Sequence, residues 1–281
     1  MYLTARKRLR MAGFDTSDSE ARLIVTTAAG KSVEQFMRDR NLYVTDATFE
    51  NTVETLIDRR IAGEPIAYIL GEWEFYGMPL TVNRDVLIPR IDTEVLAEAT
   101  ISELKNNLHG KRILDLCAGS GCVGLVIAAN VPFSRVILAD KSPEALKTCR
   151  VNTIRNKLTR SVTSIELDAL EEPPMLVGVF DFIVSNPPYI PTWEIETLDK
   201  SVRDYEPIAA LDGGTDGLEF YKFIASKWKT VLKENGRIAF ECGAGQAEDV
   251  RGILTDNGYT DIKTVKDTLD IERVVIATVS K

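Results

Sequence analysis

A four-residue loop, Asn186-Pro187-Pro188-Tyr189, combines residue types that suit chemistry on a flat amide group, and it follows an apolar run at residues 180–184. The side-chain oxygen of Asn186 and the backbone carbonyl of Pro187 are two acceptors that can receive the two N–H bonds of one amide. Such acceptors hold a planar nitrogen in place and stabilise the positive charge that develops on it during attack. Tyr189 can stack on the flat group. We therefore predict that Asn186, Pro187 and Tyr189 take part in catalysis.

The same loop has a simpler interpretation as an Asn-Pro-Pro turn in which Tyr189 only packs. Proline cannot continue a central strand, so in either case the chain leaves its sheet here. An amide nitrogen is a weak nucleophile because its lone pair is delocalised, but it needs no strong base, since it becomes acidic only as the new bond forms. Adenine and cytosine amino groups would suit the loop as well, so the pattern indicates a reaction class rather than a substrate.

A second informative segment links an apolar run to an apolar helix, and it reads Asp115-Leu116-Cys117-Ala118-Gly119-Ser120-Gly121. Glycines at such a turn let the backbone approach a ligand, and the helix N-terminus offers unpaired N–H groups. A dinucleotide fold prefers Gly-x-Gly-x-x-Gly, which this segment matches only in a shifted frame. Asp115 would repel a pyrophosphate but suits the ammonium group of S-adenosylmethionine, which we predict as the cofactor.

Two further acidic residues follow predicted strands. Asp140 is placed to accept hydrogen bonds from ribose hydroxyls, although it could instead cap the next helix. Asp168 is assigned to the adenine amino group, because it lies at the same carboxyl edge of the sheet. The predicted cofactor-binding set is Asp115, Cys117, Ala118, Gly119, Ser120, Gly121, Asp140, Lys141, Asp168, Ala169 and Asn186.

The elements that must position these residues alternate between strand and helix, which is typical of a doubly wound α/β sheet. Strands are predicted at 112–116, 135–139, 162–167, 180–184, 237–241, 262–265 and 272–279. Helices are predicted at 122–130, 143–157, 218–232 and 246–257. Only a short polar turn joins the last two strands, so they should pair antiparallel.

The first 70 residues predict a small helical bundle, with helices at 18–29, 32–38 and 46–62. In the third helix, apolar residues recur at the spacing of one helical face. At 72–86 the pattern changes to aromatic and β-branched residues interrupted by glycine and proline, which indicates a β-hairpin between two domains.

Composition excludes several classes of function. The chain has 281 residues and a formal net charge of −8, so it offers no basic field for nucleic acid, and we expect no DNA partner. No apolar stretch approaches the roughly 20 residues that span a bilayer, and no signal peptide is present, so we expect a cytoplasmic protein without membrane contact. Nothing in the sequence requires more than a monomer.

The cysteines and the histidine suggest no metal site. Four cysteines form no Cys-x-x-Cys pair and no zinc spacing, so we expect four reduced thiols, mostly buried. The single histidine, His109, sits in a polar stretch at 105–111, which argues against a Ser-His-Asp triad and any multi-histidine site, and we expect it at the surface.

Taken together, these segments resemble the peptide chain release factor glutamine-N5 methyltransferases over nearly the whole chain. Besides the Asp115 and Asn186 loops, the resemblance rests on the segments at 63–71, 74–77, 87–94, 205–207 and 211–214. It implies an α/β fold with a seven-stranded class I methyltransferase domain. It also implies a helical substrate-recognition domain at 1–71, a hairpin linker at 72–88 and the methyltransferase domain at 89–281.

The resemblance further implies the substrate, which is the glutamine of a Gly-Gly-Gln loop in class I release factors. The positions matching Asn186 and Pro187 hold its amide, and Ile88, Arg90 and Pro188 join Tyr189 in the substrate-binding set. For Arg90, a surface salt bridge with Asp92 or Glu94 is the alternative. The chain departs from many members at Cys117-Ala118, where they carry Gly-Thr, and at Ala169, where some carry an aromatic residue.

Three other functions compete with this one. A related enzyme methylates glutamine in a ribosomal protein and shares the Asn-Pro-Pro-Tyr loop, but the segment at 89–94 fits the release-factor branch better. A nucleic-acid adenine-N6 methyltransferase would need the phosphate contacts that this acidic chain lacks. A purely docking role would leave the Asn186 loop without a purpose.

Gly243-Ala244-Gly245-Gln246 looks like the substrate motif, but we interpret it as a strand-to-helix turn.

Overall fold

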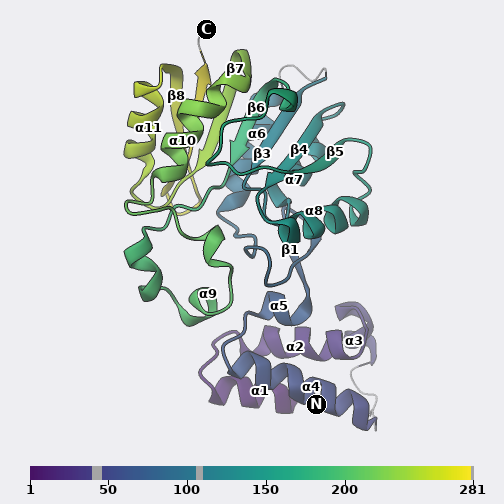
Figure 1. Cartoon of the computed structure of the whole chain (residues 1–281). Helices are drawn as coiled ribbons and strands as arrows, with labels where there is room; N and C mark the ends of the chain where they lie inside the picture. Colours follow the sequence, from purple (N-terminus) through teal and green to yellow (C-terminus); the bar gives the residue numbers. More distant parts are fainter. Residues whose placement is uncertain (40–45, 106–109, 280–281) are drawn as a thin grey trace. The chain divides into compact units, whose positions relative to one another are not determined.

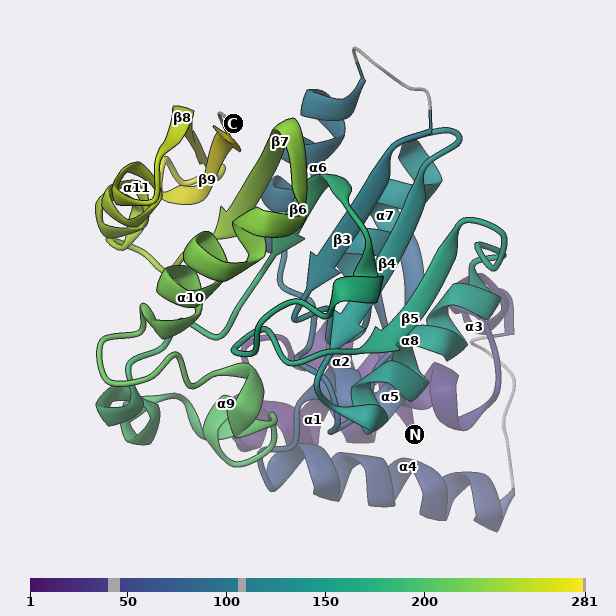
Figure 2. The same cartoon turned by 45° about the horizontal axis from the view of Figure 1, so that its top comes forward.

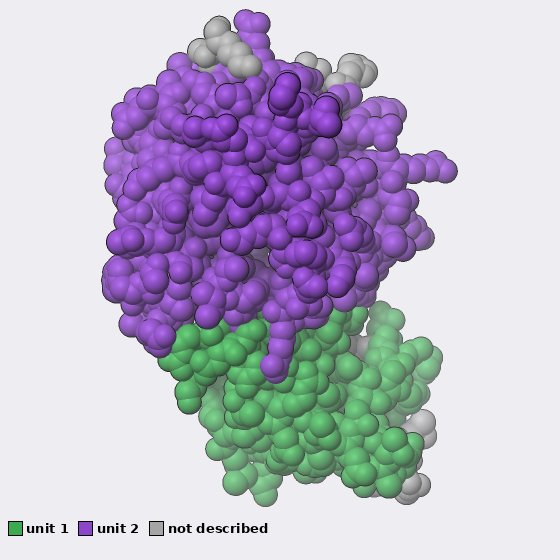
Figure 3. Space-filling model, viewed as in Figure 1, with its two compact units in different colours: residues 1–72, 199–205 green, residues 73–198, 206–281 purple. Residues whose placement is uncertain are grey.

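The structure, a computed structural model, describes residues 1–39, 46–105 and 110–279 (Figure 1). It divides into two compact units, which Figure 3 colours separately. Unit 1 comprises Met1–Glu72 and Asp199–Tyr205, and unit 2 comprises Trp73–Leu198 and Glu206–Lys281. The domain boundaries inferred from the sequence stay a prediction. His109 lies outside the described residues.

Unit 1 is helical. Its helices are α1 (Tyr2–Met11), α2 (Ser17–Ala28), α3 (Val33–Asp39), α4 (Ala47–Ile61), α5 (Ile66–Leu70) and α9 (Lys200–Arg203). The helices predicted at 18–29, 32–38 and 46–62 correspond to α2, α3 and α4. The sequence analysis missed α1, because only Ala5 and Leu9 of that helix are buried and its apolar pattern is sparse.

A small core of aliphatic side chains holds unit 1 together. Leu9, Ile24, Val53 and Ile57 come from three helices and are fully buried. Each such side chain stabilises the fold by roughly 1.5–3 kcal/mol. Asp46 caps α4 by accepting a hydrogen bond from the backbone N–H of Thr48 at 2.8 Å.

Unit 2 carries two sheets. Strands β1 (Glu72–Phe75), whose first residue belongs to unit 1, and β2 (Met78–Thr81) form the predicted hairpin. The large sheet contains β3 (Arg112–Leu116), β4 (Arg135–Asp140), β5 (Val162–Glu166), β6 (Phe180–Ser185), β7 (Leu232–Glu241), β8 (Tyr259–Lys266) and β9 (Glu272–Val279). Its order is β5-β4-β3-β6-β7-β9-β8. Strands β3 to β7 pair parallel, whereas β9 pairs antiparallel with both β7 and β8. The predicted seven-stranded α/β sheet and its antiparallel end are therefore confirmed.

Helices cover both faces of the large sheet (Figure 2). The longer helices of unit 2 are α6 (Thr93–Leu104), α7 (Cys122–Asn130), α8 (Pro143–Arg155), α10 (Glu219–Lys227) and α11 (Ala247–Asp256). Side chains of α6, α7 and α8 share one buried cluster with the sheet, and those of α10 and α11 share another. Neighbouring strand residues such as Ile113 and Leu114 enter opposite clusters. The sheet is thus buried on both sides, as its long apolar runs require.

One helix and two boundaries in unit 2 differ clearly from the sequence analysis, and other boundaries differ by one to three residues. Helix α6 was not predicted, and the helix predicted at 218–232 ends earlier, because a 3₁₀ turn (Trp228–Val231) leads directly into β7. That strand begins five residues before the predicted 237, through a polar stretch that contains Asn235 at a positive φ of 56°. Among the described residues, no helix is long and apolar enough to cross a membrane.

Candidate active site

The order of the strands creates a site at one edge of the sheet. The chain moves outward from β3 through β4 to β5 and then returns to place β6 on the other side of β3. Ligands of open α/β sheets bind at such a reversal, outside the carboxyl ends of the strands. A cavity of about 740 Å³ lies there, which is within the size range of cofactor sites.

Most of the predicted cofactor residues border this one cavity. They are Asp115, Cys117, Ala118, Gly119, Ser120, Asp140, Lys141, Asp168, Ala169 and Asn186. Gly121 does not border the cavity. It is instead the N-cap of α7 with φ 82°, and a Cβ on it would lie 2.9 Å from a methyl group of Leu138. Gly121 therefore shapes the loop rather than contacting the cavity.

The loop after β3 is held by its neighbours rather than by its own residues. Cys117 and Gly119 have positive φ values of 60° and 55°. The Gly119 backbone N–H donates to Asp140 Oδ2 at 2.9 Å, and the Asn152 side chain donates to the Ser120 carbonyl at 2.9 Å. Cys117 tolerates a conformation that favours glycine only because this surrounding framework fixes it.

Asp115 is a buried carboxyl at the floor of the cavity. It is 2% exposed, and its Oδ2 accepts the backbone N–H of Gly124 at 2.8 Å. Burial raises the pKa of Asp115 to about 7, and the charge of Asp140 adds to this effect. A cation in the cavity would restore the ionised form, since it supplies the opposite charge that burial removes.

Asp140 faces the cavity from the end of β4. Its two oxygens accept backbone N–H groups of Gly119 and Ser142, both at 2.9 Å. The N-cap of α8 is Ser142, which accepts from the Ala145 N–H at 3.1 Å, so Asp140 is not the helix cap itself. Burial raises the pKa of Asp140, while these backbone hydrogen bonds act to lower it. Each oxygen retains a lone pair for a hydroxyl donor.

Asp168 and Lys141 stand together on the β5 side of the cavity. Asp168 Oδ1 accepts the N–H of Leu170 at 2.9 Å, and Lys141 Nζ lies 3.9 Å from Asp168 Oδ2. Ala169 is 4% exposed, and its carbonyl accepts the indole N–H of Trp228 at 3.0 Å. The backbone beside Asp168 is thus fixed from the far side of the sheet.

The predicted catalytic loop reaches the same cavity in part. Asn186 and Pro188 border it, whereas Pro187 and Tyr189 are not among its lining residues. Asn186 follows the last residue of β6, and its Nδ2 donates to Thr93 Oγ1 at 3.2 Å. This bond turns the nitrogen end of the amide toward Thr93, so Oδ1 points away from Thr93 and remains to accept a hydrogen bond.

Two other segments support this loop. The Gln246 side chain donates to the Tyr189 carbonyl and accepts from the Gly243 N–H, both at 2.9 Å. Gly213 packs so closely that a Cβ on it would lie 2.7 Å from Tyr189 Cα and 2.8 Å from the Pro188 carbonyl oxygen. The Gly-Gly-Gln look-alike is therefore the predicted strand-to-helix turn, with Gln246 as the N-cap of α11.

The segment that contains Ile88 and Arg90 has a partner that sequence reasoning missed. Glu206 accepts the Ile88 backbone N–H at 3.1 Å through one oxygen and pairs with the Arg90 guanidinium through the other. Pro89 borders the cavity, but Ile88 and Arg90 do not. Neither Asp92 nor Glu94 is the partner found for Arg90, and its role in substrate binding stays a prediction.

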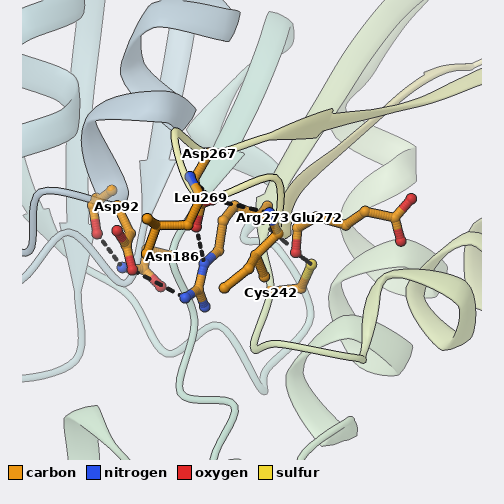
Figure 4. A network of polar contacts seen from close by, with 9 residues as sticks. Asp92, Asn186, Cys242, Asp267, Leu269, Glu272 and Arg273 are labelled. Atoms are coloured by element: carbon orange, nitrogen blue, oxygen red, sulfur yellow. Dashed lines mark hydrogen bonds and ion pairs between the residues drawn. The ribbon is translucent and has the colours of Figure 1, made fainter.

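Behind Asn186 lies a polar network that the sequence did not reveal (Figure 4). Arg273, at the start of β9, pairs with Asp92 at 3.0 Å and with Asp267 at 2.9 Å. Asp92 precedes Thr93, the hydroxyl partner of Asn186. The buried carboxyl of Glu241 adjoins Thr93, Asn186 and Arg273. The only signal in the sequence that could have indicated this network is the acidic type of Asp92, Asp267 and Glu241.

The four cysteines are free thiols, and three of them are buried, as expected. Burial raises the pKa of Cys122 to about 12 and that of Cys117 still further. Neither thiol is therefore a nucleophile at neutral pH. The cavity offers carboxylates, backbone N–H groups and one oriented amide, a set that binds a cationic nucleoside and holds a planar NH₂ group.

Comparison with known proteins places the chain among characterised relatives. Residues 2–71 match the model of the PrmC N-terminal domain, and residues 91–198 match the methyltransferase small domain. A release factor glutamine methyltransferase from Clostridium acetobutylicum is 41% identical over 246 residues, covering 85% of this chain and 86% of the relative. One from Agrobacterium fabrum is 38% identical over 276 residues, covering 97% and 94%. A methyltransferase structure from Pyrococcus furiosus shares the fold, with a TM-score of 0.53 and 17% identity over 83% of this chain and 99% of that one.

Proposed function

The chain belongs to the family of release factor glutamine methyltransferases, and we propose that it methylates the glutamine side chain in the Gly-Gly-Gln motif of class I peptide chain release factors. The donor is S-adenosylmethionine and the product is S-adenosylhomocysteine. The named relatives extend over more than four fifths of this chain, which supports assigning their activity to it. The proposed location is the cytoplasm, where release factors act.

The cavity residues fit this cofactor in charge and in shape. Asp115 would hold the ammonium of the methionine moiety, Asp140 the ribose hydroxyls and Asp168 the adenine amino group. The left-handed turn at Cys117 and Gly119 exposes backbone to the cavity without a bulky side chain. When bound, S-adenosylmethionine supplies a methyl group activated by its positive sulfur.

The chain's own contribution to transfer is orientation. Asn186 Oδ1 and the Pro187 carbonyl accept the two N–H bonds of the glutamine amide and hold its plane toward the donor. Positive charge that grows on the nitrogen during attack is stabilised by these two acceptors. Tyr189 stacks on the amide, while Ile88, Arg90 and Pro188 shape the approach of the substrate.

One observation carries this proposal. Asn186 borders the same cavity as the three acidic residues, and its amide nitrogen is already bonded to Thr93. The acceptor end of the side chain is therefore available beside the predicted donor site. A turn that served only to end β6 would not need an amide of defined orientation at this point.

The test is a transfer assay with labelled S-adenosylmethionine and a purified release factor. We expect label on the Gly-Gly-Gln peptide, identified by mass spectrometry, and none on a release factor whose motif glutamine is changed to glutamate. Ribosomal protein and DNA serve as parallel acceptors. Preferential labelling of either one would refute the release-factor assignment and favour the corresponding rival.

A variant separates the two halves of the site. Asn186→Ala should lower transfer by about 100-fold or more, because one acceptor for the nascent cation is lost. Cofactor affinity, measured by calorimetry, should change by less than about 3-fold. If cofactor affinity instead fell as far as transfer, Asn186 would belong to cofactor binding rather than to the amide site.

A further inference from the structure

Glu241 ends β7 directly beside Asn186. The parallel register pairs Ser185, the last residue of β6, with Phe240 of β7. The residues that follow them, Asn186 and Glu241, are therefore neighbours across the two strands. Glu241 is 2% exposed and does not border the cavity. It therefore lies behind the amide rather than in front of it.

This carboxyl is expensive to bury, and its surroundings do not fully compensate. The Thr93 and Asn186 side chains adjoin it and favour its ionised form, yet Oε2 has no hydrogen-bond partner among the described residues. An apolar or neutral side chain would fill this position at a lower cost in stability. Polar groups retained against stability are typical of functional sites.

The carboxylate of Glu241 determines which neighbouring groups donate hydrogen bonds and which accept them. An ionised carboxylate can only accept, so a hydroxyl beside it, as that of Thr93 is, turns its hydrogen toward Glu241 and its lone pairs outward. Thr93 Oγ1 then accepts from Asn186 Nδ2, at 3.2 Å. The Asn186 oxygen is consequently turned away from this chain of bonds and toward the substrate.

We propose that Glu241, acting on the Asn186 amide both directly and through Thr93, is a positioning residue that fixes the polarity of that amide, so that its oxygen and not its nitrogen meets the glutamine. This inference rests on the proposed role of Asn186. An amide rotated by half a turn would present a donor to the substrate's own N–H donors, and the productive geometry would be lost.

Arg273 and Asp92 complete the framework. Arg273 lies on β9 next to Val274, the residue that pairs with Glu241 in the antiparallel register. Its guanidinium pairs with Asp92 at 3.0 Å, which anchors the start of α6 and with it Thr93 (Figure 4). The charge of Arg273 also favours the ionised form of Glu241.

The proposal has a pH signature. Burial raises the pKa of Glu241 to about 7, above its ordinary value of 4.5. Below that pH the protonated carboxyl can itself donate a hydrogen bond, so it no longer forces Thr93 and Asn186 to direct their hydrogens toward it. We expect the wild-type kcat to fall as pH drops through about 7.

Other charged and titratable groups face Glu241 from the elements around it. They are Asp92 just before α6, Cys122 on α7, Tyr189 in the loop, Tyr221 on α10, Cys242 just after β7 and Arg273 on β9. Burial raises the pKa of the two thiols and the two phenols far above neutrality. Asp115 in the cofactor site also has a pKa of about 7, so kcat must be measured at saturating cofactor.

The experiment compares Glu241→Gln, Thr93→Val and Thr93→Ser in the full chain with a release factor as substrate. Glu241→Gln can present nitrogen to its neighbours, and Thr93→Val removes the hydroxyl at constant shape. Each should lower kcat by about 10- to 100-fold, with KM and cofactor affinity within about 3-fold of wild type. Thr93→Ser should restore most of the rate, and Glu241→Gln should lose the acidic limb of the pH profile.

The kcat of the combined Glu241→Gln/Thr93→Val variant should lie within about 3-fold of the kcat of the slower single variant, because both substitutions disturb the positioning of the same amide. If Glu241→Gln does not fold, the Thr93 pair carries the test. Equal rates for Thr93→Val and wild type would overturn the inference, as would an unchanged acidic limb in Glu241→Gln. Asn186→Ala separates the proposed function from the proposed role of Glu241. If Asn186→Ala retained methyl transfer, the proposed amide site would be wrong. If Asn186→Ala were inactive while Thr93→Val kept the wild-type rate, only the role of Glu241 and Thr93 would be refuted.

Discussion

Replacing Gly213 with alanine should disable the catalytic loop without touching it directly. A Cβ at this position would lie 2.7 Å from Tyr189 Cα, 2.8 Å from the Pro188 carbonyl oxygen and 2.9 Å from the Tyr189 carbonyl carbon. All three are backbone atoms, so no side-chain rotation can relieve the contacts. The φ of Gly213 is not in the left-handed region, and alanine would therefore meet no backbone strain of its own.

The size of the effect follows from these distances. Ordinary van der Waals contact begins at 3.4 Å, so the loop or the segment around Gly213 must move by about 0.7 Å. A displacement near 1 Å in a positioning element costs roughly 100-fold in rate. Overpacking of this kind also lowers the free energy of unfolding by about 1–3 kcal/mol. We expect kcat to fall by about 30- to 100-fold, while cofactor affinity stays within about 3-fold of wild type.

The assay measures labelled methyl transfer to a release factor at saturating cofactor, alongside calorimetry for cofactor binding and urea denaturation for stability. Gly252→Ala in α11 is the matched control, because its Cβ would meet nothing within 4 Å. That variant should keep wild-type kcat and gain about 0.5–1 kcal/mol in stability. A Gly213→Ala enzyme that turned over as fast as Gly252→Ala would show that close packing at Gly213 does not position the loop.

Three further outcomes are expected. Asp140→Asn should weaken cofactor binding by about 10- to 100-fold, because an NH₂ group replaces an acceptor; calorimetry tests this, with the exposed Glu144→Gln as the charge-matched control. Asp115 favours its protonated form in the folded state, with a pKa of about 7 against 3.8, so the free energy of unfolding of wild type should fall by about 3 kcal/mol relative to that of Asp115→Asn as pH rises from about 4 to 7. Parallel stability curves for these two proteins would contradict that. Asn152→Ala should lower the free energy of unfolding by about 2–4 kcal/mol, since its side chain joins β2 to the cofactor loop by three hydrogen bonds; the exposed Asn130→Ala should cost less than about 0.5 kcal/mol in the same denaturation experiment.

Some errors of the sequence analysis have identifiable physical causes. Strand β7 starts at Leu232, inside a stretch whose Asn235 and Gly236 suggest a turn. Local composition predicted a loop there, but pairing with β6 extends the strand, with a register shift between Phe180 and Phe182. Tertiary hydrogen bonds thus override local propensity where an irregular pair can absorb an awkward residue.

The sequence alone was enough for the architecture and for most of the cavity. Apolar runs separated by helical segments predict parallel strands, and the carboxyl ends of parallel strands must meet at one edge. Asp115, Asp140, Asp168 and Asn186 each stand at or just after such an end, so their convergence follows from chain order and needs no knowledge of packing. Periodicity and strand ends are local properties, and local properties are legible in sequence.

Tertiary structure alone decided which groups face these residues from behind. Arg90 pairs with Glu206, 116 positions away, and the Asn186 amide bonds to Thr93, 93 positions away. No periodicity connects such positions, and nearer acidic residues were available to Arg90. The polarity of one amide, on which the proposed chemistry depends, is set by buried partners from separate elements, and only the folded chain brings those elements together.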